Sequence, residues 1–199
     1  EATRIITKKY PDTRVLVLVA KQPDAAVADR IHEQLLSLER PVVVRYLGQA
    51  GRPADRHVHY ADDLEHAAHI AAALARRQRV DALDRQVAVD RVVAAVDPRP
   101  APDSRFVGLF GGGSLASEAR LALERAGVRG EVPDEPIPAR TPFGGGQRHL
   151  VIDTGEDVYT VGKPHPMVDQ TVRCAMLEAA ASDPAVGVIL LDLVLGDGS

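Results

Sequence analysis

Three consecutive glycines and a serine, 111-GGGS-114, follow a short apolar run and open a segment with the apolar spacing of a helix. Glycines let backbone N–H groups approach a ligand closely, and the N-terminus of a helix carries partial positive charge. Ser114 is placed to cap that helix. Gly111, Gly112, Gly113 and Ser114 therefore predict a turn that contacts an anion or an acyl group, although a strand-to-helix turn that binds nothing has the same letters.

The same stretch fits G-x-G-x-x-A, a variant of the dinucleotide-binding fingerprint. That fingerprint requires an acidic residue at the end of the next strand, roughly 20 residues further on. Here we expect the next strand to end at Asp153, which is about twice as far away. A nicotinamide cofactor is therefore disfavoured.

A second candidate lies in 158-VYTVGKPHPMVD-169, where prolines flank His165 on both sides. Pro166 suits the first position of a helix, which we expect from about 166 to 181. His165 would then stand at the helix N-terminus, where the dipole disfavours an imidazolium and keeps the ring neutral. With the positive charge of Lys163, this arrangement predicts a clamp for a phosphate or carboxylate. A helix-capping histidine beside a solvated lysine is the alternative.

Two further groups could bind metals. The carboxylates of 153-DTGED-157 could hold Mg²⁺ through oxygen atoms, or form a solvated turn in which Asp153 caps backbone amides. Four histidines, at positions 57, 59, 66 and 69, form two pairs that each share a face of a strand or helix. Because neither a cysteine nor a zinc motif accompanies them, we predict no metal site.

No catalytic residue can be assigned from these patterns. The sequence contains no nucleophile elbow, Walker loop or Cys–His pairing, and Ser114 and Ser117 have no obvious base. The prediction is therefore restricted to binding residues.

The elements that must position these residues alternate between strands and helices. β-branched runs predict strands, and apolar residues spaced three or four apart predict helices. In the first half we expect strands at 14–20, 41–48 and 57–61, a helix capped by Asp24, a helix from Asp62 or Asp63 to about 79, and a helix at 81–96.

In the second half we expect strands at 106–110, 149–155 and 185–196, and a helix from Ser114 that ends at Gly127. Its predicted apolar face consists of Leu115, Ala119, Ala122, Leu123 and Ala126.

This alternation predicts an α/β fold with right-handed parallel crossovers and helices on both faces of each sheet. We expect two flavodoxin-like three-layer units, residues 1–97 and 105–199, either of which could be incomplete. The proline-rich segment 98–104 would be the linker. Ligands of such sheets bind at the carboxyl ends of strands, so the loops at Gly111, Gly155 and Gly196 are predicted to line the site.

Composition limits the function classes. The net charge is -4, and the basic residues are scattered along the sequence and form no patch that could bind phosphates. A nucleic-acid partner is therefore not expected. The longest apolar run, 185–196, is too short to cross a membrane, and Cys174 cannot form an internal disulfide. We therefore predict a cytoplasmic location without membrane attachment. The chain lacks an initial Met and stops soon after its last strand, which leads us to expect a fragment.

Segments of the second half resemble the FdrA-type proteins, relatives of succinyl-CoA synthetase and the NDP-forming acyl-CoA synthetases. The phrase YTVGKPHPMVD is close to the string Y-T-x-G-R-P-H-P-M-I-D of that group. More distantly, the half is similar to the ligase domain of the synthetase β subunit. In that comparison Gly111 to Leu115 matches the turn NGAGL, 152-IDTG-155 the strand end LDVGG, and 192-DLVLG-196 the loop NIFGG.

The first half looks like the later part of the α-subunit-type ligase domain, through 15-VLVLVAKQPD-24 and 40-RPVVVRYLG-48. It departs from that family in the loop 48–63, where the G-H-A-G-type motif that carries a phosphohistidine is missing. Neither a CoA-binding domain nor an ATP-grasp domain is found, so we expect no cofactor within this chain.

The resemblance implies an FdrA-like protein that binds an acyl-phosphate or acyl-CoA-type substrate and takes part in acyl or phosphoryl transfer. Two alternatives stay open: a subunit of a carbamoyltransferase complex in purine or allantoin catabolism, and a noncatalytic assembly module. The expected partners are a small anion, acyl or carbamoyl phosphate, and further subunits in a homo- or hetero-oligomer. The predicted binding residues are Gly111, Gly112, Gly113, Ser114, Asp153, Gly155, Lys163, His165 and Gly196.

Overall fold

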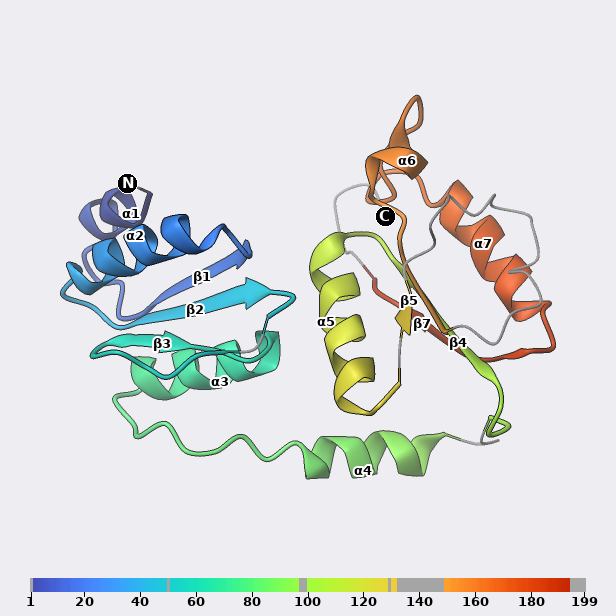
Figure 1. Ribbon diagram of the computed structural model, residues 1–199, viewed down its shortest axis with the longest axis horizontal. Helices are drawn as coiled ribbons and strands as arrows, with labels where there is room; N and C mark the ends of the chain where they lie inside the picture. The colour runs from blue at the N-terminus through green and yellow to red at the C-terminus, as the bar shows by residue number, and fades with distance from the viewer. Residues whose placement is uncertain (1, 50, 97–99, 129, 132–148, 194–199) are drawn as a thin grey trace. The chain divides into compact units, whose positions relative to one another are not determined.

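The computed structural model describes residues 2–49, 51–96, 100–128, 130–131 and 149–193. The chain divides into two compact units, Glu1–Ala95 and Val96–Ser199 (Figure 1). They are called the first and second unit below, and each is described by itself. No helix in the described ranges is long and apolar enough to cross a membrane.

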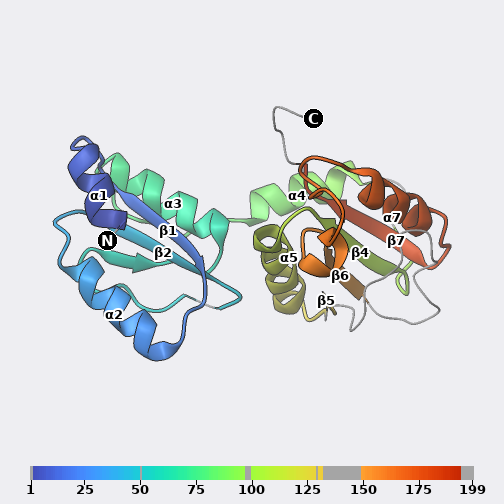
Figure 2. The same cartoon turned by 90° about the horizontal axis from the view of Figure 1, so that it is seen from above.

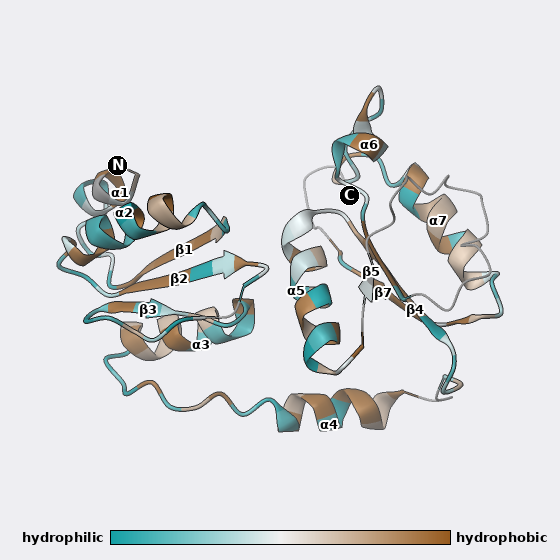
Figure 3. Cartoon of the chain, viewed as in Figure 1, coloured by the Kyte–Doolittle hydropathy of each residue, from teal (hydrophilic) through white to brown (hydrophobic). Residues whose placement is uncertain are grey.

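The first unit contains a parallel sheet in the order β1-β2-β3. Its strands are β1 (Leu16–Lys21), β2 (Val42–Leu47) and β3 (Val58–Tyr60). The central strand β2 is buried on both faces, as its continuous β-branched run requires. Apolar residues are concentrated in the strands of this sheet (Figure 3).

Helices cover both faces of this sheet. α2 (Ala25–Leu36) packs on one face through Ala28 and Leu35. α3 (Leu64–Ala75) packs on the opposite face through Ala67 and Ile70 (Figures 1 and 2). The sequence did not indicate α1 (Ala2–Lys9).

We expected α3 to start at Asp62 or Asp63, and Asp63 is its N-cap residue. The Oδ1 atom of Asp63 accepts the N–H of His66 at 2.8 Å. The predicted end of this helix near residue 79 is wrong. Arg77 has a φ of 59°, in the left-handed region, and the helix stops at Ala75.

The predicted helix at 81–96 also begins later than expected. α4 spans Gln86–Ala95. The residue before it, Arg85, donates to the carboxylates of Asp63 and Glu65, so its side chain is directed back to the start of α3. The segment before α4 is thereby held by tertiary contacts instead of continuing the helix.

The strands of the second unit are β4 (Arg105–Phe110), β5 (Gly130–Glu131), β6 (His149–Asp153) and β7 (Val186–Leu191), and its helices are α5 (Gly113–Arg125), α6 (Asp157–Thr160) and α7 (Thr171–Ala181). The strands form a parallel sheet in the order β5-β6-β4-β7. α5 covers one face of this sheet, and α7 covers the other (Figures 1 and 2).

Two predicted details of α5 are wrong. Gly112, not Ser114, is the N-cap residue. The buried face contains Ala116 together with Ala119 and Leu123, whereas Leu115 is 44% exposed. Ala119 and Leu123 belong to both the predicted and the observed face, and Ala116 takes the place of Leu115, which lies about 100° away around the helix axis.

The predicted start of α7 at residue 166 is also wrong, because a separate turn precedes the helix. The carbonyl of His165 accepts the N–H groups of Val168 and Asp169, at 2.8 and 3.1 Å. The Asp169 carboxylate then accepts both the N–H and the hydroxyl of Thr171, where α7 begins. These hydrogen bonds lower the pKa of Asp169 below its usual range. His165 is therefore not at the helix N-terminus.

The predicted fold class is confirmed: α/β, with two parallel-sheet units that carry helices on both faces, as in flavodoxin-like units. The predicted strands begin within two residues of the observed ones, whereas β5 and α6 were not predicted.

Candidate functional site

Loops from three strands meet at the carboxyl edge of the second sheet. Gly111 follows β4, Thr154 follows β6, and Asp192 follows β7. The buried Thr154 joins two of these loops, because its N–H and its hydroxyl both donate to the carbonyl of Phe110, at 2.8 and 2.7 Å. The edge that parallel-sheet proteins use for ligands is thus built from hydrogen-bonded loops.

Gly155 lies where two of these loops come closest. A Cβ at this position would be 2.8 Å from the Gly111 carbonyl oxygen and 2.8 Å from Nε2 of His165. Both distances are shorter than a carbon atom tolerates, so the glycine is required by the close approach. Gly111, Gly155 and His165, all three predicted to bind ligand, are brought together here.

His165 is oriented by the turn in which it lies. Its Nδ1 atom accepts the N–H of Met167 at 3.2 Å, which assigns the hydrogen of a neutral ring to Nε2. Nε2 faces Gly155, so the ring presents a donor to the loops after β4 and β6. The orientation of His165 is thus set by a turn and not by the N-terminus of a helix.

The N-terminus of α5 is the second source of donors. Its N-cap residue, Gly112, has no side chain that could cap it, and the N–H groups in its first turn have no intrahelical acceptor. One carboxylate lies beside it: Oδ2 of Asp153 is 3.0 Å from the position of a Cβ on Gly113. Oδ1 of Asp153 accepts the N–H of Gly155 at 2.9 Å. An incoming anion would therefore meet both partial positive charge and the Asp153 charge.

A buried ion pair fixes the loop after β4, and sequence reasoning missed it. Arg173 of α7 and Asp192 approach to 2.6 Å, with both side chains almost fully buried. Oδ1 of Asp192 also accepts the N–H of Gly111 at 2.8 Å. A signal was present: Arg173 falls on the same stripe of α7 as the buried Met176 and Ala180. An arginine on an apolar stripe implies a buried acidic partner.

The remaining predicted binding residues within the described ranges take no part in the close contact around Gly155. A Cβ on Gly112 would have no neighbour within 4 Å, so the loop does not require a glycine there. The side chains of Ser114, in the first turn of α5, and of Lys163, which follows α6, are exposed. Gly196 lies outside the described residues.

The histidines of the first unit do not gather. Nε2 of His57 lies 3.2 Å from the carbonyl oxygen of Leu35, at the amino end of β3. Burial, and then the nearby charge of His57, lower the pKa of His59. His66 lies against Asp62, and His69 against the carbonyl of Asp81. In the described part of the chain, no group of three or more His, Cys, Asp or Glu side chains could hold a metal ion.

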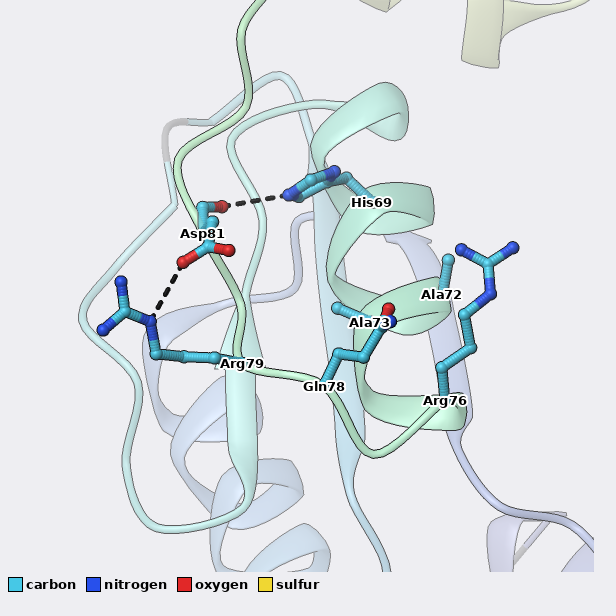
Figure 4. Close-up of a pocket in the computed structure, with 7 residues that line it drawn as sticks. All are labelled: His69, Ala72, Ala73, Arg76, Gln78, Arg79 and Asp81. Atoms are coloured by element: carbon cyan, nitrogen blue, oxygen red, sulfur yellow. Dashed lines mark hydrogen bonds and ion pairs between the residues drawn. The ribbon is translucent and has the colours of Figure 1, made fainter.

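A cavity of about 380 Å³ lies between α3 and the segment that follows it (Figure 4). Its walls include Arg76, Arg79 and Asp81, and Arg79 is paired with Asp81 at 2.9 Å. The cavity lies at the C-terminal end of the helix, where the carbonyl ends disfavour an anion. The edge around Gly155 is therefore the better candidate.

The sequence of the second unit can be compared with known proteins. Residues 109–199 match the CoA-ligase family model. The CoA-ligase segment therefore begins within β4 and includes Gly111, Gly155 and His165. This match supports the succinyl-CoA synthetase-like superfamily.

A curated relative covers nearly the whole chain. The uncharacterized protein YahF of Escherichia coli (strain K12) is 34% identical over 193 residues, which are 95% of this chain and 37% of that protein. The chain thus spans little more than a third of the length of this relative.

Proposed function

We propose that the CoA-ligase segment binds a small anionic substrate of the acyl-phosphate or acyl-CoA type and takes part in acyl or phosphoryl transfer, as an FdrA-like protein. The observation that carries this proposal is the contact of His165 and the Gly111 loop across Gly155. It brings a histidine donor close to a glycine turn that leads into a helix with glycine as its N-cap residue.

These groups suit an oxygen that gains negative charge during transfer. N–H groups at the start of α5 and Nε2–H of His165 are held in place by the fold before a ligand arrives. Such fixed donors stabilise developing charge because they need no reorganisation. Lys163 would offset the carboxylate of Asp153, which otherwise opposes anion binding.

A carbamoyl phosphate substrate is the second candidate, and the first unit favours it. We assign that unit to the later part of an α-subunit-type ligase unit. His57, the histidine that follows the loop after β2, lies at the amino end of β3 with its ring against Leu35. A carbamoyl-transferring complex does not need a phosphohistidine in that loop. A noncatalytic assembly module is the remaining alternative.

Calorimetry with acetyl phosphate, carbamoyl phosphate and CoA tests the proposal on the wild type, on His165→Ala and on the control His69→Ala. We expect either acetyl phosphate or carbamoyl phosphate to bind to the wild type. His165→Ala should weaken this binding by about tenfold, and His69→Ala should leave it unchanged. Tighter binding of acetyl phosphate supports the acyl reading, and tighter binding of carbamoyl phosphate supports the alternative. If neither binds, or if His165→Ala binds as the wild type does, the site proposal is wrong.

A further inference from the structure

A network of four side chains in the first unit has no part in the function proposed above. His32 comes from α2, Tyr60 ends β3, and Arg52 and Asp55 lie in the segment between β2 and β3. His32 links two of them, with Nε2 2.9 Å from Oδ2 of Asp55 and Nδ1 2.7 Å from Oη of Tyr60. We call these four residues the Tyr60 network.

The hydrogen atoms of this network can be assigned from its partners. A carboxylate only accepts, so Nε2 of His32 carries a hydrogen toward Asp55. Nδ1 of the neutral ring then accepts the hydroxyl hydrogen of Tyr60. The Tyr60 oxygen in turn accepts from Nη2 of Arg52. Donation therefore runs from Arg52 through Tyr60 and His32 to Asp55.

Arg52 retains most of its hydrogen-bonding capacity in this arrangement. Its guanidinium carbon lies 4.1 Å from the centre of the Tyr60 ring. Its acidic neighbour in the described residues, Asp29, is 3.9 Å away, which is beyond hydrogen-bond distance. The guanidinium thus has only a long, exposed ion pair with Asp29, which leaves donors of its planar fork for another acceptor.

Tyr46 provides a second unused donor in the same neighbourhood. Its side chain is 9% exposed, and its buried hydroxyl has no hydrogen-bond partner among the described residues. Its ring centre lies 6.4 Å from that of Tyr60. Burial, followed by the neighbouring Tyr60, raises the pKa of Tyr46, while Arg52 lowers it. A buried hydroxyl without a hydrogen-bond partner destabilises the fold, so an acceptor there would be favourable.

We propose that Arg52 and Tyr46 form a second ligand site, which takes a small oxyanion, a phosphate or carboxylate group. The guanidinium supplies charge and paired donors, and the Tyr46 hydroxyl supplies one more. The Tyr60 network holds Arg52 in place, because Tyr60 is itself fixed by His32 and Asp55. This site lies in the first unit, and it does not depend on the function proposed for the second.

Tyrosine ring signals can test this proposal in the full chain. The protein has 4 Tyr and 0 Trp, so ¹³C-labelled tyrosine gives few signals, which single Tyr→Phe variants assign. Inorganic phosphate and acetate are titrated separately. We expect saturable shifts of the Tyr46 and Tyr60 signals, with the exposed Tyr10 as an internal control. A saturable shift with either anion supports the site. The anion that binds more tightly shows whether the site prefers a phosphate or a carboxylate group.

Two variants separate a ligand site from a purely structural network. Tyr46→Phe removes the unpaired hydroxyl and keeps the ring, so we expect unchanged or higher thermal stability but about fivefold weaker anion binding at the Tyr60 signal. Arg52→Gln is expected to abolish binding, while Arg76→Gln, an exposed arginine of the same unit, leaves it unchanged. If neither anion gives a saturable shift, or if Tyr46→Phe and Arg52→Gln bind as the wild type does, the site is rejected.

Discussion

Nε2 of His165 lies 2.8 Å from the point that a Cβ on Gly155 would occupy. His165 and Gly155 are ten positions apart in the sequence, and they meet because the turn after α6 returns to the end of β6. This contact limits the side chain at position 155 to a hydrogen atom.

Gly155→Ala is therefore expected to displace His165 or the Gly111 loop. We expect a loss of about 1–3 kcal/mol in the free energy of unfolding and weaker phosphate binding. Chemical denaturation and calorimetry measure the two effects. Gly112→Ala is the control for the steric effect on stability alone, because its Cβ would meet nothing within 4 Å. An equal loss of stability in the two variants would show that the close approach at Gly155 has no consequence.

Asp153→Asn distinguishes an anion site from a cation site at the start of α5. Its carboxylate lies beside Gly113, so removal of the charge is expected to strengthen phosphate binding by about threefold to tenfold. A magnesium site would respond in the opposite direction. Titrations of acetyl phosphate and of Mg²⁺ with this variant check the sign, and weaker phosphate binding would contradict the anion assignment.

Arg173→Met leaves the carboxylate of Asp192 buried without its cation. We expect a loss of about 3–5 kcal/mol of stability, since both side chains are less than 10% exposed. Urea unfolding followed by circular dichroism measures it. Arg79→Met breaks the exposed pair with Asp81 and should cost little. A similar loss of stability in both variants would contradict the expectation that the buried pair contributes more to stability than the exposed pair.

The stability of the first unit is expected to fall as the solution is acidified below pH 6.5. Burial lowers the pKa of His59 from its ordinary value of 6.5. Below that value the unfolded chain binds a proton that the folded chain does not, so the free energy of unfolding decreases. The loss continues until the pH reaches the lower pKa of the folded state.

His59→Gln should reduce this pH dependence, and unfolding in urea at pH 7.5 and 5.5 measures it. His69→Gln, a change on the surface of α3, controls for the removal of a histidine. An unchanged difference between the two pH values in His59→Gln would show that another group causes the acid sensitivity.

Much of the fold follows from local patterns in the sequence. The runs at 14–20, 41–48 and 106–110 are β-branched or apolar and became parallel strands. The spacing of apolar residues predicted α2, α3 and α5. The ends of helices were predicted less well, because Arg77, Arg85 and Asp169 end or delay helices through contacts that periodicity does not encode.

The candidate site was also predicted only in part from the sequence. Residue types and the motif at 158–169 were sufficient to select Gly111, Gly155 and His165 as candidates. Their meeting required the sheet order, which places the ends of β4 and β6 side by side. The Arg173–Asp192 pair and the Tyr60 network were not predicted, since their members are separated by many residues and interact only after the chain has packed. Local sequence determines which backbone conformations and donors are present; burial and strand pairing, which are long-range, determine which of those donors face one another.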